Sequence, residues 1–415
     1  MWYDPGTPMR IRLLLSALVV ALAAATASAT TIVVPTDDDL LAASRAVVAG
    51  RVAEIRARRT DGGRAIHTYV TLDVETVLAG DAPAGRIVLK EMGGRVGDEF
   101  SIVYGTPEYA VGERVLVYLE TDADGAWRTT MMFAGKFSVV TRGGAACVVR
   151  RRGGEGVHEV APLGAGTTTD EAGYNEYVTA VAARARTARR AVWPSPARAV
   201  PVEYAAPAAA RDEEEFSNNF TLLTGRPRWF EPDEGLPVPF KFKPAPALLD
   251  QGEGGVRDAM AAWSSVAGCS LTVELVDDTE LCGFSRDGES TISFDDCKNQ
   301  IGSAPCTGVI AIGGVSGRST ERKTVNGVEF VRITEADVVF NNQQDGCILA
   351  RRLTFREVLT HELGHALGLG HSSEMGPEPN ARLSEATMYY QLHDDGRAAS
   401  IKPDDVDGIL FLYPI

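Results

Sequence analysis

The sequence predicts an α+β protein, in which a mainly β N-terminal domain precedes a domain that combines a sheet with helices. Short runs of β-branched and aromatic residues, separated by glycine-rich turns, fill residues 30 to about 160. A proline- and alanine-rich stretch follows and indicates a linker. Beyond it, strand-like runs alternate with segments of helical periodicity. A chain of 415 residues has room for two or three such domains.

The N-terminus has the pattern of a secretory signal peptide. Arg10 and Arg12 precede an apolar run at 13–25, and the triplet 27–29 (Ala-Ser-Ala) fits a cleavage site. The apolar run is short for a membrane span, although an uncleaved anchor helix is the alternative. We therefore expect residues 1–29 to be removed and the protein to be secreted, extracellular or periplasmic, without membrane association afterwards.

Residues 30–187 are expected to form the β-rich N-terminal domain, a small barrel or sandwich. Its strand-like runs are Val47–Val52, Tyr69–Glu75, Ile87–Leu89, Arg114–Leu119 and Phe137–Val140. A closing helix is predicted because apolar residues then recur at helical spacing, at Tyr174, Tyr177, Val178, Val181 and Ala185. Residues 188–216 are the expected linker. The arginines at its start (184, 186, 189 and 190) indicate either a processing site or a solvated helix face.

The C-terminal domain, residues 217–415, begins with a strand at 238–243. A helix is predicted around Val256, Met260 and Trp263 because these apolar residues follow helical spacing. Three further strands are predicted, at 271–275, 291–294 and 308–313.

One segment carries most of the functional information. Residues 361–371 read His-Glu-Leu-Gly-His-Ala-Leu-Gly-Leu-Gly-His, which is H-E-x-x-H-x-x-G-x-x-H. His361 and His365 lie one helical turn apart, so both rings can reach one metal ion. Gly368 tolerates positive φ and lets the chain turn so that His371 becomes a third ligand. Three protein ligands with an open position describe a catalytic zinc site.

The helix that carries these residues has its own start signal. Thr354 and Glu357 are spaced as a capping box before an apolar run. The alternative to a metal site is a buried helix that happens to contain three histidines. Only six histidines occur in the chain, and three of them fall at ligand spacing.

The motif resembles the metzincin proteases, and the surrounding sequence resembles their matrixin branch, in its bacterial form. Met388 stands where that family has its methionine turn. Residues 335–341, 308–313 and 403–414 resemble the strand before the active-site helix, the edge strand and the closing helix. The resemblance covers about residues 220–415 and implies a twisted mixed sheet with three helices.

The resemblance implies a secreted zinc-dependent endopeptidase that cleaves protein or peptide substrates. Glu362 would be the general base that activates water, and Met388 would pack beneath the ligands. Tyr389, Tyr390, Ile310 and Ala311 are candidates for the substrate pocket, because the edge strand can pair with an extended peptide. A zinc-binding but catalytically idle binding or adhesion module is the alternative. Retention of Glu362 argues against it, since binding zinc does not need the base.

One catalytic Zn²⁺ is the expected cofactor, and Ca²⁺ is a further candidate. The remaining histidines at 67, 158 and 393 are scattered, so the sequence gives no cluster for a second, structural zinc. The net charge of −15 argues against nucleic acid as a partner. We expect a monomer.

Six cysteines are consistent with export, and five of them lie in the C-terminal domain. Cys297 and Cys306 enclose a short loop and are the favoured disulfide pair. Cys147 lies alone in the N-terminal domain. If that domain is an inhibitory pro-region, Cys147 could place a thiolate on the zinc, although a buried strand cysteine or half of a disulfide are the alternatives.

Overall fold

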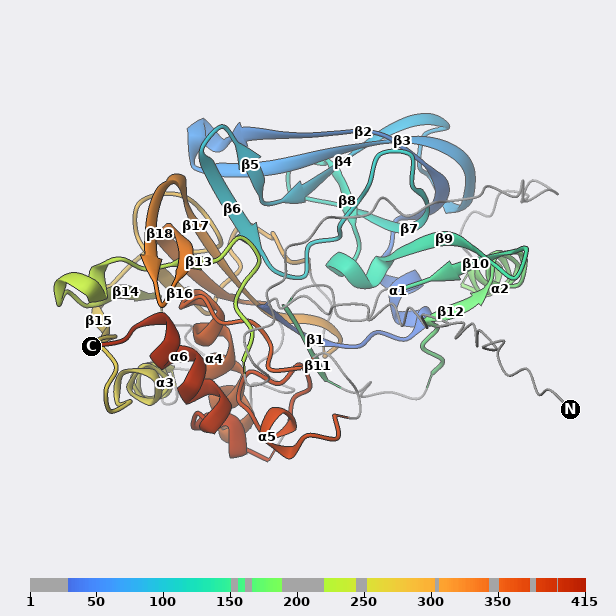
Figure 1. The fold of residues 1–415 in the computed structure, drawn as a ribbon. Helices are drawn as coiled ribbons and strands as arrows, with labels where there is room; N and C mark the ends of the chain where they lie inside the picture. Colours follow the sequence, from blue (N-terminus) through green and yellow to red (C-terminus); the bar gives the residue numbers. More distant parts are fainter. Residues whose placement is uncertain are drawn as a thin grey trace, which may run out of the picture.

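Two β sheets and the helices packed on them make up the described part of the chain (Figure 1). The computed structural model describes residues 29–150, 156–160, 166–188, 220–243, 252–302, 306–342, 351–373, 378–393 and 395–415. The predicted signal peptide, apart from Ala29, and nearly all of the predicted linker lie outside these residues.

The first sheet is built from the N-terminal part of the chain. Its described strands run in the order β12-β10-β9-β7-β2-β3-β4-β8. β7 also pairs with β8, so the pairings from β7 through β2, β3 and β4 to β8 close on themselves. The strands are β2 (Ala46–Thr60), β3 (Ala65–Gly80), β4 (Gly85–Met92), β7 (Arg114–Thr121), β8 (Trp127–Thr129), β9 (Lys136–Arg142), β10 (Ala145–Val149) and β12 (Glu171–Gly173).

The second sheet is mixed and follows the order β11-β1-β17-β18-β16-β14-β15. β15, β14, β16 and β18 run parallel to one another, whereas β17 is antiparallel to β18. β13 pairs with β18, and β5 and β6 extend the sheet beside β17. The strands are β1 (Ala29–Val33), β5 (Gly94–Val96), β6 (Glu99–Val103), β11 (Gly156–Val160), β13 (Pro227–Arg228), β14 (Val238–Lys243), β15 (Val273–Asp278), β16 (Thr291–Ser293), β17 (Gly308–Val325) and β18 (Val328–Phe340).

The two halves of the chain are therefore joined through the second sheet. β1, β5, β6 and β11 come from the region expected to form the N-terminal domain, yet they continue the sheet that begins with β14 and β15. β17 is the strand at the junction, because β18 pairs with one of its edges while β1 and β6 pair with the other.

Three helices cover this sheet beside the metal-binding motif. α3 (Gly252–Ser264), α4 (Arg352–Ala366) and α6 (Pro403–Leu412) lie together at the lower left of Figure 1. Their apolar faces share one core with the sheet, which includes Trp263, Leu363 and Ile409, each fully buried. A short helix, α5 (Ala381–Ser384), precedes the residues around Met388.

A second apolar core joins the two halves. It contains Phe137 and Tyr177 from the N-terminal part, and Val309, Ile312 and Val339 from β17 and β18. The predicted closing helix is confirmed as α2 (Tyr174–Thr187), and its predicted apolar face is buried in or beside this core. α1 (Asp37–Ala43) lies next to it, where Arg184 of α2 forms ion pairs with Asp37 and Asp38.

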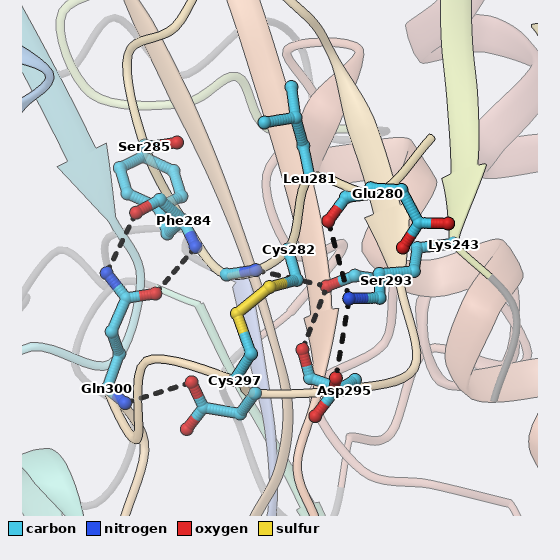
Figure 2. Close-up of a disulfide and its surroundings, with 12 residues drawn as sticks. Lys243, Glu280, Leu281, Cys282, Phe284, Ser285, Ser293, Asp295, Cys297 and Gln300 are labelled. Carbon is cyan, nitrogen blue, oxygen red and sulfur yellow. Dashed lines mark hydrogen bonds and ion pairs between the residues drawn. A yellow bond between two sulfur atoms is a disulfide. The ribbon is translucent and has the colours of Figure 1, made fainter. Parts of the chain in front are cut away.

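A disulfide ties the segment after β15 to the segment after β16. It joins Cys282 to Cys297 (Figure 2), with the Cα atoms 6.1 Å apart. The favoured pair, Cys297 with Cys306, is therefore wrong, although Cys306 is also disulfide-bonded. Two hydrogen bonds beside the disulfide hold the same two segments together. The backbone N–H of Phe284 donates to the side chain of Gln300 over 2.7 Å, and the Gln300 amide donates to the carbonyl of Phe284 over 2.8 Å.

The disulfide also supports β17. The ring of Phe284 lies against Gly314, where a Cβ atom would come within 2.3 Å of the ring. Cys147 and Cys269 are free thiols.

Replacing Cys282 by serine should lower the stability of the metal-free protein. The disulfide closes a loop of 15 residues, so its loss should reduce the free energy of unfolding by about 3 kcal/mol. Cys147→Ser is the matched control, because that thiol is free, and it should change stability by less than about 0.5 kcal/mol. Urea unfolding followed by tryptophan fluorescence measures both, and equal midpoints would contradict the assignment of the disulfide.

Candidate metal centre

Helix α4 supplies the first two histidines of the motif and the glutamate between them. Nearly every residue from Thr354 to Ala366 is buried, because α4 is surrounded by α3, β17 and β18. The predicted capping box is wrong. The helix begins at Arg352, so Thr354 already lies inside it, and the N-cap residue Arg351 makes no side-chain cap. The buried carboxylate of Glu357 instead accepts hydrogen bonds of 2.7 and 3.0 Å from the backbone and ring of His393.

The turn after α4 depends on Gly368, as the sequence predicted. Its φ is +105°, and a Cβ atom there would lie 2.7 Å from the carbonyl oxygen of Pro227. The segment before β13 then holds the turn in place. Leu223 donates to Gly368 over 3.1 Å, and Gly370 donates to Thr221 over 2.9 Å. This pairing returns the chain toward α4 and delivers His371.

The three histidines converge on one point. Nε2 of His361 lies 2.8 Å from Nε2 of His365 and 3.1 Å from Nε2 of His371. Nitrogen ligands at tetrahedral angles around zinc would be separated by about 3.3 Å. Among the described residues, these three form the one group of histidine, cysteine or acidic side chains close enough to hold a metal ion.

Carbonyl oxygens fix the tautomer of two of the rings. Nδ1 of His361 lies 2.7 Å from the carbonyl oxygen of Thr387, and Nδ1 of His365 lies 2.8 Å from that of Leu369. A carbonyl can only accept, so each Nδ1 carries the hydrogen and each Nε2 keeps a free lone pair for a metal. Burial lowers the pKa of His361 well below its ordinary value and that of His371 to about 3. All of these features suit a divalent cation with nitrogen ligands.

Glu362 is fully buried beside the histidines. Its Oε1 accepts a hydrogen bond of 2.6 Å from the hydroxyl of Thr31, and its Oε2 has no partner among the described residues. Burial raises its pKa to about 8, opposed by the Thr31 hydroxyl and by the backbone amides of Thr31 and Gly313. A cation held by the histidines would favour the ionised carboxylate.

Met388 lies in the core against α4, and its role in a methionine turn stays a prediction. It is buried, and a Cβ atom on Gly364 of α4 would come within 2.4 Å of its sulfur. The glycine in the motif therefore allows the turn to approach the helix closely. Trp263 lies on the same side and donates its indole N–H to the carbonyl of Thr360 over 2.9 Å.

Asp405 holds the turn at Thr387 and Met388, and sequence reasoning missed it. Its carboxylate accepts backbone N–H groups from Thr387, Met388 and Lys402 over 2.8, 2.9 and 2.6 Å. Thr387 in turn accepts from the ring of His361, so one carboxylate connects α6 to a metal ligand. The available signal was its place in the first turn of a helix that begins with Pro403, where carboxylates accept free amides.

The candidate pocket residues are all buried. Tyr389 and Tyr390 follow Met388 and are buried, with ring centroids 5.0 Å apart. Ile310 and Ala311 are fully buried on β17. The outer edge of β17 carries β1, in which Thr31 is opposite Ala311. Their role in substrate binding stays a prediction.

Two residues near the centre come from the N-terminal part and were not anticipated. They are Thr31, which bonds Glu362, and Tyr104, whose ring centroid is 5.8 Å from that of His365. Cys147 is elsewhere. It lies on β10 of the first sheet, opposite Val140 and Gly173, and is not part of the histidine group.

Known proteins resemble the C-terminal half of the chain. The matrixin family matches residues 249–414. Metalloendoproteinase 2-MMP and metalloendoproteinase 5-MMP of Arabidopsis thaliana are 26% and 25% identical, over 47% and 48% of this chain and 45% and 48% of their own. Metalloendoproteinase 1 of Glycine max is 25% identical over 48% of this chain and 56% of its own. The chain thus spans about half the length of the curated relatives it matches.

Asp405→Asn should weaken metal binding without touching a ligand. An amide presents its NH₂ group to N–H donors that the carboxylate accepts, so the turn that orients His361 should loosen at a cost of about 1–3 kcal/mol. We expect zinc affinity to fall about 10- to 100-fold in competition with a chromophoric chelator, as for other partners of metal ligands. Asp407→Asn, on the same helix, is the control and should bind zinc like the wild type.

Proposed function

We propose that this chain, in which residues 249–414 are a matrixin-like metzincin domain, is a zinc-dependent endopeptidase with Glu362 as its general base. The observation that carries the proposal is the arrangement of three buried imidazoles around one point, with the buried carboxylate of Glu362 next to the first of them in the chain. The matrixin match and the similarity to plant metalloendoproteinases support a metalloprotease in general. The base, the ligands and the order of steps are inferred from the geometry.

The residues divide the chemistry among themselves. His361, His365 and His371 would hold the zinc, which supplies Lewis-acid chemistry by acidifying water and polarising a carbonyl. Glu362 takes a proton from the attacking water while the hydroxyl adds to the scissile carbonyl carbon. It then delivers that proton to the leaving nitrogen as the C–N bond breaks. The free Oε2 of Glu362 is the atom available for this transfer.

The remaining assignments concern the setting of the enzyme. We propose a secreted protein with a signal peptide at 1–29, a β-rich domain at 30–187 that contains a small barrel, a linker at 188–216 and a catalytic domain at 217–415. The disulfide between Cys282 and Cys297 is compatible with export. Among the described residues, no helix has the length and apolar character needed to cross a membrane.

A zinc-binding module without catalysis is the rival function. One observation favours it, since β1 covers the edge of β17 to which a substrate would bind. The two functions are separated by cleavage of a denatured protein with and without a chelator, measured on protein freed of that strand.

Glu362→Ala should keep zinc and lose peptidase activity. All three ligands remain, so zinc content should stay at the wild-type value, while loss of the base should reduce cleavage of a denatured protein by about 10²–10⁴-fold. Glu253→Ala, at an exposed position on α3, is the control. Near wild-type cleavage by the Glu362 variant would rule out the assigned mechanism.

His371→Ala should reduce zinc affinity, because two nitrogen ligands remain where three were present. Titration under limiting metal measures this, and the affinity should fall by more than about 100-fold, as for the loss of a direct ligand. His67→Gln is the control, since His67 bonds Thr60 in the first sheet. An unchanged affinity would show that His371 is not a ligand.

A further inference from the structure

Two strands from the N-terminal part cover the outer edge of β17. β6 pairs with Gly314–Arg318, and β1 pairs with Gly308–Ile312. Both pairings are antiparallel. Apart from a bulge at Ile310, β17 therefore has partners from Gly308 to Arg318 on the edge that faces the metal centre, where an extended peptide would otherwise pair.

The two strands follow one another in the same direction, like the halves of a single peptide. Along β17 from Arg318 toward Gly314, the partner residues run from Glu99 to Val103. Tyr104 continues this line, with its N–H donating to Gly313 over 3.3 Å. Thr30 is next, opposite Ile312, and β1 then runs on to Val33 opposite Gly308.

The junction between the two strands lies at the metal centre. Glu362 contacts Thr31 on one side of the junction, and the ring of Tyr104 on the other side lies by His365. Tyr104 and Thr30 are far apart in sequence and share no peptide bond. The arrangement thus fills the edge of β17 on both sides of the centre and offers no bond for hydrolysis between them.

Side chains of the two strands alternate between the two halves of the protein. Val33 and Phe100 belong to the core that contains Leu363 of α4, whereas Ile32 and Val103 belong to the core shared with the first sheet. The strands are thus anchored in their own domain while their opposite faces enter the matrixin-like domain.

Polar contacts hold the same interface at its ends. The buried hydroxyls of Ser101 and Ser316 lie 2.9 Å apart. Arg128 donates to the carbonyl oxygens of Asn299 and Gln300 over 2.8 and 2.6 Å. Polar contacts therefore join the N-terminal part both to β17 and to the segment after β16.

We propose that the N-terminal β domain is a built-in inhibitor of the peptidase, in which β6 and β1 occupy the edge of β17 on either side of the metal centre. We call this edge the groove, because an extended substrate would pair with it. The inference rests on the proposed function, because it assigns the groove to a protein substrate. In this proposal the inhibitor acts by occupying the edge of β17, and not by placing a thiolate of Cys147 on the zinc. The Thr31 hydroxyl also donates a hydrogen bond to Glu362, the proposed base.

The first experiment tests docking without relying on activity. Ser101→Cys and Ser316→Cys are combined in the full chain, with Cys147→Ser and Cys269→Ser to remove the free thiols. Directly opposite residues on antiparallel strands are close enough for a disulfide. Mild oxidation should cross-link the two, in both the active and the Glu362→Ala background, and peptide mass spectrometry without reduction detects the bond. Absence of the cross-link in folded protein would overturn the inference.

The second experiment tests whether the strands close the groove. A chain that lacks Thr30–Val33, and the single variant Thr31→Val, are compared with the wild type for cleavage of denatured casein and for binding of a fluorescent peptide hydroxamate at equal zinc content. Apparent binding scales with the open fraction, so deletion of β1 should raise both by about tenfold or more. Thr31→Val should raise both less, and Thr31→Ser, which keeps the hydroxyl, should match the wild type.

The outcomes separate the two proposals. If the oxidised Ser101→Cys/Ser316→Cys protein binds the hydroxamate as well as the protein with Ser101→Cys alone, the groove is open and the inhibitor role is wrong. The same holds if neither the deletion nor Thr31→Val increases hydroxamate binding in folded protein. If the deletion increases hydroxamate binding but no variant cleaves casein, the strands do close the groove and the proposed peptidase activity fails instead.

Discussion

The hydrogen-bonding edge of β17 is the constraint on which the rest of the structure depends. One edge of this strand is satisfied by β18, and the other must be satisfied by a peptide, by water or by another strand. Here β6 and β1 satisfy it. This pairing places Thr31 and Tyr104 next to the metal centre, and it lets the two halves of the protein share a core.

The metal centre shows the same dependence on remote backbone groups. Nε2 of a neutral histidine can bind a metal ion when the ring hydrogen is on Nδ1, and the carbonyls of Thr387 and Leu369 accept that hydrogen in two of the three rings. Asp405 fixes the turn that supplies the first carbonyl. Met388 can approach α4 this closely only because residue 364 is a glycine. The arrangement of the three rings is thus set by separate segments that pack around α4.

These two features explain why the N-terminal domain matters to a site that it does not supply with ligands. Thr31 bonds the carboxylate of Glu362, and Tyr104 packs beside His365, so both lie beside the histidine group. A buried carboxylate with a raised pKa needs a donor or a cation to stay ionised. The Thr31 hydroxyl partly fills that role while its strand occupies the groove.

The sequence by itself determined that His361, His365 and His371 come together and that the chain turns at Gly368, because these depend on residue type at fixed local spacing. It also predicted individual elements, since periodicity is a local property, and the helix at 174–187 is an example. Tertiary structure alone decided that Cys282 pairs with Cys297, that Glu357 bonds His393 instead of capping α4, and that Asp405 supports the turn. It also decided that β1 and β6 lie on β17. Pairing between strands that are hundreds of residues apart depends on which strand edges the folded protein brings together. A local sequence pattern does not contain that information.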